Sequence, residues 1–179
     1  AHEDLILGLK TIGNRSRGLV NFINAYRDYT NIPSPNFAEV SSKQLIKYVA
    51  NLMKQELNKS QIDLQLELPE KEVELRADEE QIQLILINLI KNAREALTGK
   101  ENPLIKISLL STAQHHYITV EDNGPGVVPE ALERIFIPFF TTKKDGSGIG
   151  LALSRQIMQL HQGHLDVVSK PEELTGFSM

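Results

Sequence analysis

Two asparagines and a glutamate lie in register within an otherwise apolar stretch that has the pattern of a helix. Asn88 and Asn92 are four residues apart and Glu95 follows three residues later, so a helix would carry all three on one face. Asparagine is a mediocre helix former, and its amide resists burial. The pair is either a solvated polar stripe or a source of neutral oxygen ligands aimed into a cleft, suited to a hard cation such as Mg²⁺ that is shared with phosphates.

Glycines are concentrated immediately before a second helical pattern. Gly146, Gly148 and Gly150 would let the backbone approach an anion, and the helix N-terminus that follows would supply free N–H groups and a favourable dipole. Lys143 lies beside them and could screen phosphate oxygens. The segment matches neither the dinucleotide fingerprint, whose third glycine is replaced by Leu151, nor the P-loop. It is therefore either an ordinary loop or a phosphate-binding loop of another kind.

A third cluster, "EDNGPG", follows a β-branched run. Residues 115–122 alternate in the manner of a half-buried strand, which places Asp122 at or just past the strand's end. Its carboxylate could accept a hydrogen bond from an exocyclic amine, and Gly124 and Gly126 would leave room for a flat ring. Taken alone, the Asn-Gly and Pro-Gly pairs favour a simple β-turn.

The elements that must position these clusters follow from apolar periodicity. The clearest helix is expected over residues 78–99, with acids in its first turn and a glycine at its end. Further helices are expected over 41–60, 129–136 and 149–160, and strands over 62–68, 72–78, 104–111, 115–122 and 163–169. Sequential strands are close enough for antiparallel pairing. The order of elements favours an α+β fold, a two-layer α/β sandwich with helices on one face of the sheet.

The N-terminal part of the chain has the pattern of one long amphipathic helix. Residues 1–30 contain no proline, and their apolar residues recur at alternating spacings of four and three, as in a heptad seam. The stretch "NIPSPNF" ends this helix, because each proline removes a donor and disfavours helix at the residue before it. The expected organisation is a helix over 1–30, a linker over 31–39 and a main domain over 40–179.

Composition restricts the classes of function. With 41% hydrophobic residues in 179, the chain can bury a core, and no apolar run approaches the roughly 20 residues that cross a bilayer. The net charge of −4 argues against a nucleic-acid partner. The absence of cysteine excludes disulfides and thiolate metal sites and fits a reducing compartment. The chain begins with Ala1 rather than Met, and we expect a fragment of a longer protein.

The three clusters, in this order, resemble the nucleotide-binding domain of the GHKL superfamily, the Bergerat ATP-binding fold, and within it that of the sensor histidine kinases of two-component systems. The stretch "NLIKNAREAL" resembles the family's N box, "DNGPG" its first glycine box, "FIPFFTTK" its phenylalanine box and "GSGIGLALSRQIMQLH" its second glycine box. The resemblance covers about residues 37 to 179. It implies that the chain binds ATP with Mg²⁺.

The resemblance implies a role for each cluster. Asp122 would receive the adenine amino group, and Gly126 would line the base pocket. Asn92 would coordinate the Mg²⁺ that bridges the phosphates, and Asn88, on the facing turn, is a second candidate ligand.

The segment from Phe136 to Gly150 would form a lid over ATP, with Lys143 near the phosphates. The resemblance gives catalytic roles to Asn88, Asn92 and Lys143. Its full set of nucleotide-binding residues is Asn92, Asp122, Gly124, Gly126, Phe136, Thr142, Lys143, Gly146, Ser147, Gly148, Ile149, Gly150 and Leu151.

The N-terminal helix and the "P-S-P" linker extend the resemblance to the second dimerisation helix of a nitrogen-regulation-type kinase. The resemblance then implies transfer of the γ-phosphoryl group to a histidine on a first helix that is absent from this chain, and relay to the receiver domain of a response regulator. The parent protein would be a homodimer. A cytoplasmic location is expected, with anchoring of the parent in the inner membrane left open.

Two alternatives remain beside the kinase. A GHKL ATPase would hydrolyse ATP, but those families carry a glutamate four residues before the metal-binding asparagine, where Asn88 stands here. A nucleotide-sensing or dimerisation module without catalysis is favoured by an eroded third glycine box, in which Gln162 replaces one glycine of the usual pair.

Overall fold

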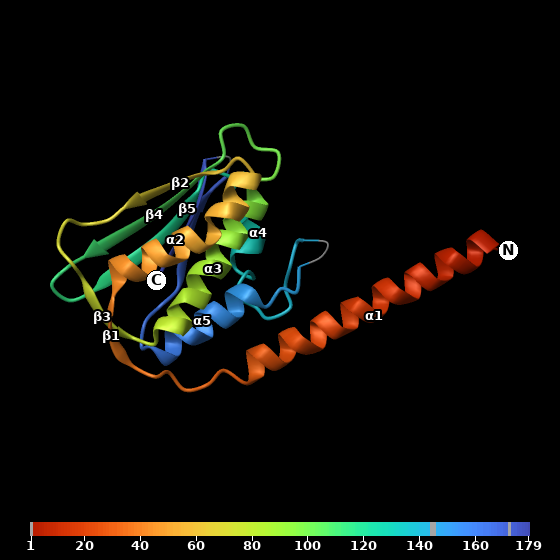
Figure 1. Ribbon diagram of the computed structural model, residues 1–179, viewed down its shortest axis with the longest axis horizontal. Coiled ribbons are helices and arrows are strands. Elements are labelled where there is room, and N and C mark those ends of the chain that lie inside the picture. Colours follow the sequence, from red (N-terminus) through yellow and green to blue (C-terminus); the bar gives the residue numbers. More distant parts are fainter. Residues whose placement is uncertain (1, 144–145, 172) are drawn as a thin grey trace.

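The computed structural model describes residues 2–143, 146–171 and 173–179, in which a long N-terminal helix projects from an α/β body (Figure 1). In chain order the elements are α1 (His2–Thr30), β1 (Ala38–Ser41), α2 (Ser42–Lys59), β2 (Asp63–Glu67), β3 (Glu74–Ala77), α3 (Glu79–Ala96), β4 (Leu104–Ser111), β5 (His116–Asp122), α4 (Pro129–Leu132), α5 (Gly150–Leu160), β6 (Asp166–Lys170) and β7 (Leu174–Ser178). The fold is α+β, as the sequence predicts.

A mixed sheet of five strands has the order β2-β4-β5-β7-β6. The pairs β4–β5, β5–β7 and β6–β7 are antiparallel, whereas β2 lies parallel to β4. The parallel pair is possible because β3 and α3 lie between β2 and β4 in the chain and carry it back across the sheet. The expectation of antiparallel pairing between successive strands is therefore right for β4 and β5 and wrong for β2. β3 pairs with β1 in a separate two-stranded sheet.

The main core lies between one face of this sheet and a layer formed by α2, α3 and α5 (Figure 1). Alternate residues of the central strands are buried on that face, and α3 buries residues at helical spacing. The fully buried large side chains are Leu45, Ile46, Val49, Leu57, Ile85, Leu86, Leu89, Ile90, Ile105, Ile107, Ile157 and Leu165. The burial of these side chains fixes α3 and α5 over the centre of the sheet.

Hydrogen bonds at the N-terminus of α3 hold this helix in place. The Asp78 carboxylate accepts the Gln81 N–H at 3.0 Å and so caps the N-terminus of the helix. Its second oxygen accepts the Asn36 N–H at 2.8 Å, and the Asp78 N–H donates to His161 Nε2 at 3.0 Å. The start of α3 is therefore tied both to the linker and to the end of α5.

Two strands were not expected from the sequence. β1 begins at Ala38, inside the stretch expected to be linker, and pairs with β3. β7 lies between β5 and β6, beyond the point where the last strand was expected. Its pairing sets Thr175 opposite Asp122, at the end of β5.

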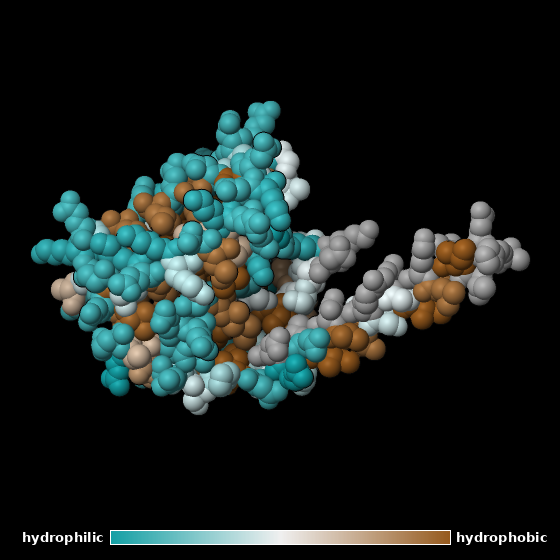
Figure 2. Space-filling model, in the orientation of Figure 1, coloured by the Kyte–Doolittle hydropathy of each residue, from teal (hydrophilic) through white to brown (hydrophobic). Residues whose placement is uncertain are grey.

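α1 exposes much of its apolar surface to solvent. Brown, hydrophobic side chains lie along the projecting helix in Figure 2. The exposed large apolar residues of α1 are Ile6, Leu9, Ile12, Leu19, Val20, Phe22, Ile23 and Tyr26. Among the described residues, no helix combines the length and hydropathy that crossing a bilayer requires.

Candidate nucleotide site

A cavity of about 1050 Å³ opens between α3, the start of α5, the ends of β5 and β7, and the segment that precedes α5. Three clusters that are far apart in the sequence line it. Of the residues singled out from the sequence, the cavity lining includes Asn88, Asn92, Asp122, Gly126, Thr142, Lys143, Gly146, Ser147, Gly148, Gly150 and Leu151. The fold therefore brings the asparagines of α3, the strand-end aspartate and the glycine-rich segment to one site.

Asp122 is buried because it continues the inward-facing series of β5. Ile118 and Val120 point into the core, and the two-residue period of a strand places Asp122 on the same face. The side chain is only 5% exposed. Among the described residues, only the Gly124 N–H donates to the carboxylate, to Oδ1 at 2.9 Å. Burial raises the pKa of Asp122 to about 6, although the Gly124 bond and the charge of Lys143 both lower it.

The glycines after Asp122 lie where a side chain would not fit. A Cβ on Gly124 would lie 2.6 Å from Asp122 Oδ1, and one on Gly126 would lie 2.9 Å from the Lys170 carbonyl oxygen. Gly126 also has a φ of +79°, which side chains rarely adopt. The backbone here consequently passes close to both the Asp122 carboxylate and the end of β6.

The two asparagines of α3 have different surroundings. Asn88 Nδ2 donates to Ser154 Oγ of α5 at 2.9 Å, and its Oδ1 lies where a Cβ on Gly150 would stand. Asn92, one turn later, accepts a hydrogen bond from Lys143 Nζ at 3.0 Å. Asn88 thus joins α3 to α5, whereas the Asn92 amide oxygen faces the opposite wall of the cavity.

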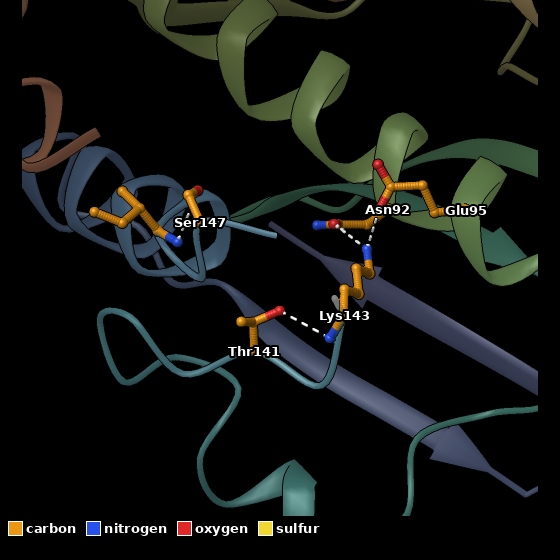
Figure 3. A network of polar contacts seen from close by, with 6 residues as sticks. Asn92, Glu95, Thr141, Lys143 and Ser147 are labelled. Atoms are coloured by element: carbon orange, nitrogen blue, oxygen red, sulfur yellow. Dashed lines mark hydrogen bonds and ion pairs between the residues drawn. The ribbon is translucent and has the colours of Figure 1, made fainter. Parts of the chain in front are cut away.

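Lys143 reaches across the cavity to α3, as Figure 3 shows. Its Nζ donates to Asn92 Oδ1 and, at 2.5 Å, to Glu95 Oε2. The backbone N–H of Lys143 donates to Thr141 Oγ1 at 3.0 Å. The Ser147 hydroxyl accepts the Ile149 N–H at 3.4 Å.

The segment before α5 is folded back on itself through a strained pair of residues. Gly148 has a φ of +67°, and a Cβ there would lie 2.6 Å from the Phe139 carbonyl carbon. Phe139 also has a φ of 67°, and its N–H donates to the Gly148 carbonyl at 2.9 Å. The following helix begins at Gly150 with no side-chain cap on its N-terminus. Free backbone donors at that end suit an anion.

Three residues expected in the site are not part of the cavity lining: Gly124, Phe136 and Ile149. The Gly124 N–H donates a hydrogen bond to the Asp122 carboxylate, and Ile149 is buried at 3% exposure. Phe136 packs against the core and lies under the Arg155 guanidinium, 4.5 Å from the ring centroid.

A match over more than half of the chain identifies the family. Residues 77–179 match the family described as histidine kinase-, DNA gyrase B- and HSP90-like ATPases. The chain belongs to this family.

Curated relatives of this ATPase-family chain are sensor histidine kinases. It is 30% identical over 162 residues to a putative NtrY-like sensor histidine kinase of Rickettsia bellii, covering 90% of this chain and 26% of the relative. It is 32% identical over 158 residues to sporulation kinase A of Bacillus subtilis, covering 87% of this chain and 24% of the relative. The chain thus spans about a quarter of the length of these relatives. It contains a catalytic domain of the type that sensor histidine kinases have.

Solved structures of the same family share the fold. The catalytic domain of histidine kinase ThkA matches with a TM-score of 0.72 and 33% identity, covering 80% of this chain and 95% of that one. ThkA in complex with the response regulator TrrA matches with a TM-score of 0.76 and 28% identity, covering 94% of this chain and 49% of that one. The first match has the extent expected of the α/β body alone.

The ATPase-type site is suited to a nucleotide and a phosphate-bound cation. The cavity combines a buried carboxylate, glycines that leave no room for a Cβ, and an uncapped helix N-terminus. Among the described residues, no group of three or more His, Cys, Asp or Glu side chains could hold a metal. A cation here would therefore depend on amide oxygens, water and the ligand's own phosphates, which are the surroundings that Mg²⁺ accepts.

Two cavity-lining residues were missed or undervalued at the level of sequence. Thr175, 4% exposed, lines the cavity from β7, a strand that was not expected. Glu95 was placed on the correct helix face, but its contact with Lys143 joins residues 48 apart and has no local signal. The alternation of "LTGFSM" after a turn could have indicated β7.

Proposed function

We propose that this chain is the ATP-binding catalytic part of a sensor histidine kinase of the nitrogen-regulation type. The observation that carries the proposal is the single cavity in which Asp122, the α3 asparagines and Lys143 meet, inside a domain of the matched family. The family supports ATP binding, and the site's chemistry supports the finer assignments below.

Adenine is proposed to bind at the Asp122 end of the cavity. The carboxylate accepts a hydrogen bond from the exocyclic amine of the base, and its burial makes that bond selective, because a base without a donor would leave a buried charge unpaired. Gly126 lines the same cavity and has no side chain that could obstruct the ring. Thr175 lies opposite Asp122 on β7 and borders the same end.

The triphosphate is proposed to lie between α3 and the start of α5. Gly146, Gly148 and Gly150 bring backbone close to it, and the α5 N-terminus offers free N–H groups. Asn92 would hold Mg²⁺ through Oδ1, with Asn88 as a second candidate ligand. The ion, when bound, neutralises charge on the phosphates.

The proposed reaction moves the γ-phosphoryl group of ATP to a histidine carried by another helix. A ring nitrogen of the histidine forms a bond to phosphorus while the bond to the β–γ bridging oxygen breaks, and ADP leaves with that oxygen. The protein's part is positioning and charge stabilisation, with Lys143 as the lid cation. Asn88 cannot act as a general base for water, which favours transfer over hydrolysis.

The proposed partners follow from the same assignment. The solved complex of ThkA with TrrA supports a response-regulator receiver domain as the next acceptor. α1 is proposed as the second helix of a dimerisation hairpin, with residues 31–39 as linker and the catalytic domain over 40–179. The parent protein would then be a homodimer.

Calorimetry with the non-hydrolysable analogue AMPPNP tests the site, with and without Mg²⁺. We expect Mg²⁺-dependent binding, and we expect Asp122→Asn to weaken it by about 1 kcal/mol or more, the worth of a charge-assisted hydrogen bond. Asp166→Asn is the matched control, because Asp166 is an exposed aspartate of the same sheet outside the cavity lining. Equal loss in both variants would remove the adenine assignment.

Labelled ATP distinguishes the kinase from its alternatives. Transfer of the γ-phosphoryl group to an added histidine-bearing hairpin supports the kinase. Release of phosphate to water without an acceptor would instead indicate an ATPase. Binding without either reaction would indicate a nucleotide-sensing module.

A further inference from the structure

The ammonium group of Lys143 lies on the oxygen to which the proposed function assigns Mg²⁺. Lys143 Nζ is 3.0 Å from Asn92 Oδ1 and 2.5 Å from Glu95 Oε2 (Figure 3). Asn92 and Glu95 are three residues apart on α3 and present neighbouring acceptors. Lys143 comes from the opposite wall of the cavity, so the contact closes the glycine-rich segment onto α3.

Two cations cannot share this position without strong mutual repulsion. An ammonium and a divalent ion on the same amide oxygen would be separated by only about 4 Å, where like charges repel. Occupation of Asn92 Oδ1 by Lys143 and by Mg²⁺ is therefore close to mutually exclusive. Binding of a Mg²⁺–nucleotide must move the lysine.

Glu95 decides where the lysine rests. Asn92 offers a neutral oxygen, which holds an ammonium group no better than water does. Glu95 adds the negative charge that makes the position attractive. The side chains of Lys143 and Glu95 are 41% and 48% exposed, so solvent screens the pair and keeps it weak enough to exchange.

The backbone around Lys143 is arranged to direct it toward α3. The Lys143 N–H donates to Thr141 Oγ1, and the Lys143 carbonyl accepts the Gly146 N–H at 3.4 Å. A Cβ on Gly146 would lie 2.6 Å from Thr141 Oγ1 and 3.2 Å from Lys143 Cβ. These three residues pack closely enough to restrict the direction of the lysine side chain.

We propose that Glu95 is a positioning residue that holds Lys143 over Asn92 until a Mg²⁺–nucleotide displaces it. Released from Glu95, the same ammonium lies within reach of the phosphates, so one side chain closes the ligand-free site and then serves the bound one. The second half of this proposal rests on the proposed function. The first half concerns the ligand-free chain and can be tested without any ligand.

Hydrogen exchange of the ligand-free chain tests the resting contact. The reporters are the backbone amides of Lys143 and Gly146. We expect Glu95→Gln and Lys143→Met each to speed their exchange by about two- to fivefold, the range of an exposed ion pair, and the double variant to add nothing. The control is Glu56→Gln, which removes the Glu56 carboxylate that Arg94 of α3 contacts at 2.9 Å outside this cavity. Unchanged reporters in Glu95→Gln would overturn the proposal.

A double-mutant cycle of AMPPNP affinity tests how Glu95 acts. With Lys143 present, Glu95→Gln should strengthen binding without Mg²⁺ by about two- to fivefold, because the lysine is free to meet the phosphates. With Lys143→Met, the same substitution should have little effect. An equal effect of Glu95→Gln with Lys143 and with Lys143→Met would mean that Glu95 only repels the phosphates. That result would overturn the proposal. If no variant binds AMPPNP either with or without Mg²⁺, the proposed function fails, and hydrogen exchange still decides the resting contact.

Discussion

Asp122 lines the cavity, and the burial of its carboxylate lowers the stability of the fold at neutral pH. Its carboxylate lies on the core face of the sheet, and burial raises its pKa from 3.8 to about 6. Between those two values the folded chain binds more protons at Asp122 than the unfolded chain does. Stability must therefore fall as pH rises through this window.

Replacing Asp122 by asparagine should stabilise the fold at neutral pH. The shift corresponds to about 3 kcal/mol at pH 7, an upper figure because local relaxation reduces it. Asparagine keeps an oxygen for the Gly124 N–H and carries no charge. We expect Asp122→Asn to unfold at higher urea than the parent chain at pH 7, with the difference shrinking to near zero by pH 4. Urea titrations of both chains across this range measure the difference.

The exposed Asp166 provides the comparison for that experiment. Asp166→Asn should show no such divergence between pH 4 and 7. A pH-independent gap for Asp122→Asn would mean that its carboxyl is not titrating in the folded state near pH 6. The sequence placed Asp122 at a strand end, and the strand period sets it on the same face as Ile118 and Val120. That the helices cover this face is what a local pattern does not report.

The turn that ends α5 places a residue other than glycine in a left-handed conformation. Gln162 follows the helix with a φ of 59°, and the Gly163 N–H closes the turn on the Met158 carbonyl at 2.8 Å. This is the position where helices favour glycine, because a left-handed conformation costs other residues about 1 kcal/mol or more. Gln162 stands where the resemblance expects a glycine, so the eroded motif has a local energetic consequence.

Gln162→Gly should therefore stabilise the chain. Relief of the left-handed conformation outweighs the added freedom of the unfolded chain, for a net gain of about 0.5–1 kcal/mol. Gln159→Gly, the same change at an exposed position inside α5, should destabilise by about 1 kcal/mol. Chemical denaturation of both variants gives opposite signs if this account holds. A loss of stability in Gln162→Gly would contradict it.

Elements with long periodic patterns were predictable, and short paired ones were not. α3 was expected over 78–99 and runs from Glu79 to Ala96, because its acidic first turn and its apolar spacing agree. β1 and β7 have four and five residues, and their strand conformation depends on pairing with β3 and β5. The parallel placement of β2 likewise depends on the path of the intervening chain rather than on its own sequence.

At the scale of the molecule, the buried core lies in the α/β body and α1 contributes none of its described residues to it. Every residue of the buried core cluster lies between Val40 and Met179. Described ring contacts of α1 with the body join Phe22 and Tyr26 to Phe139, at centroid distances of 4.9 and 6.4 Å. Most of its apolar side chains remain exposed, Leu19 at 60% and Ile23 at 54%. The body should consequently fold without α1.

Removal of residues 1–30 should change association far more than stability. Exposed apolar side chains at helical spacing favour self-association of the full chain, so its sedimentation coefficient should rise with concentration, whereas chain 31–179 should sediment as a monomer. The truncated chain should lose no more than about 1 kcal/mol of stability, since the described ring contacts of α1 are partly exposed and none of its described residues belongs to the buried core cluster. Chain 1–179 with Leu19→Lys and Ile23→Lys should also sediment as a monomer, which separates loss of the apolar face from loss of length. A loss of more than about 2 kcal/mol on truncation would instead place α1 within the cooperative fold, because differences that large arise from buried packing.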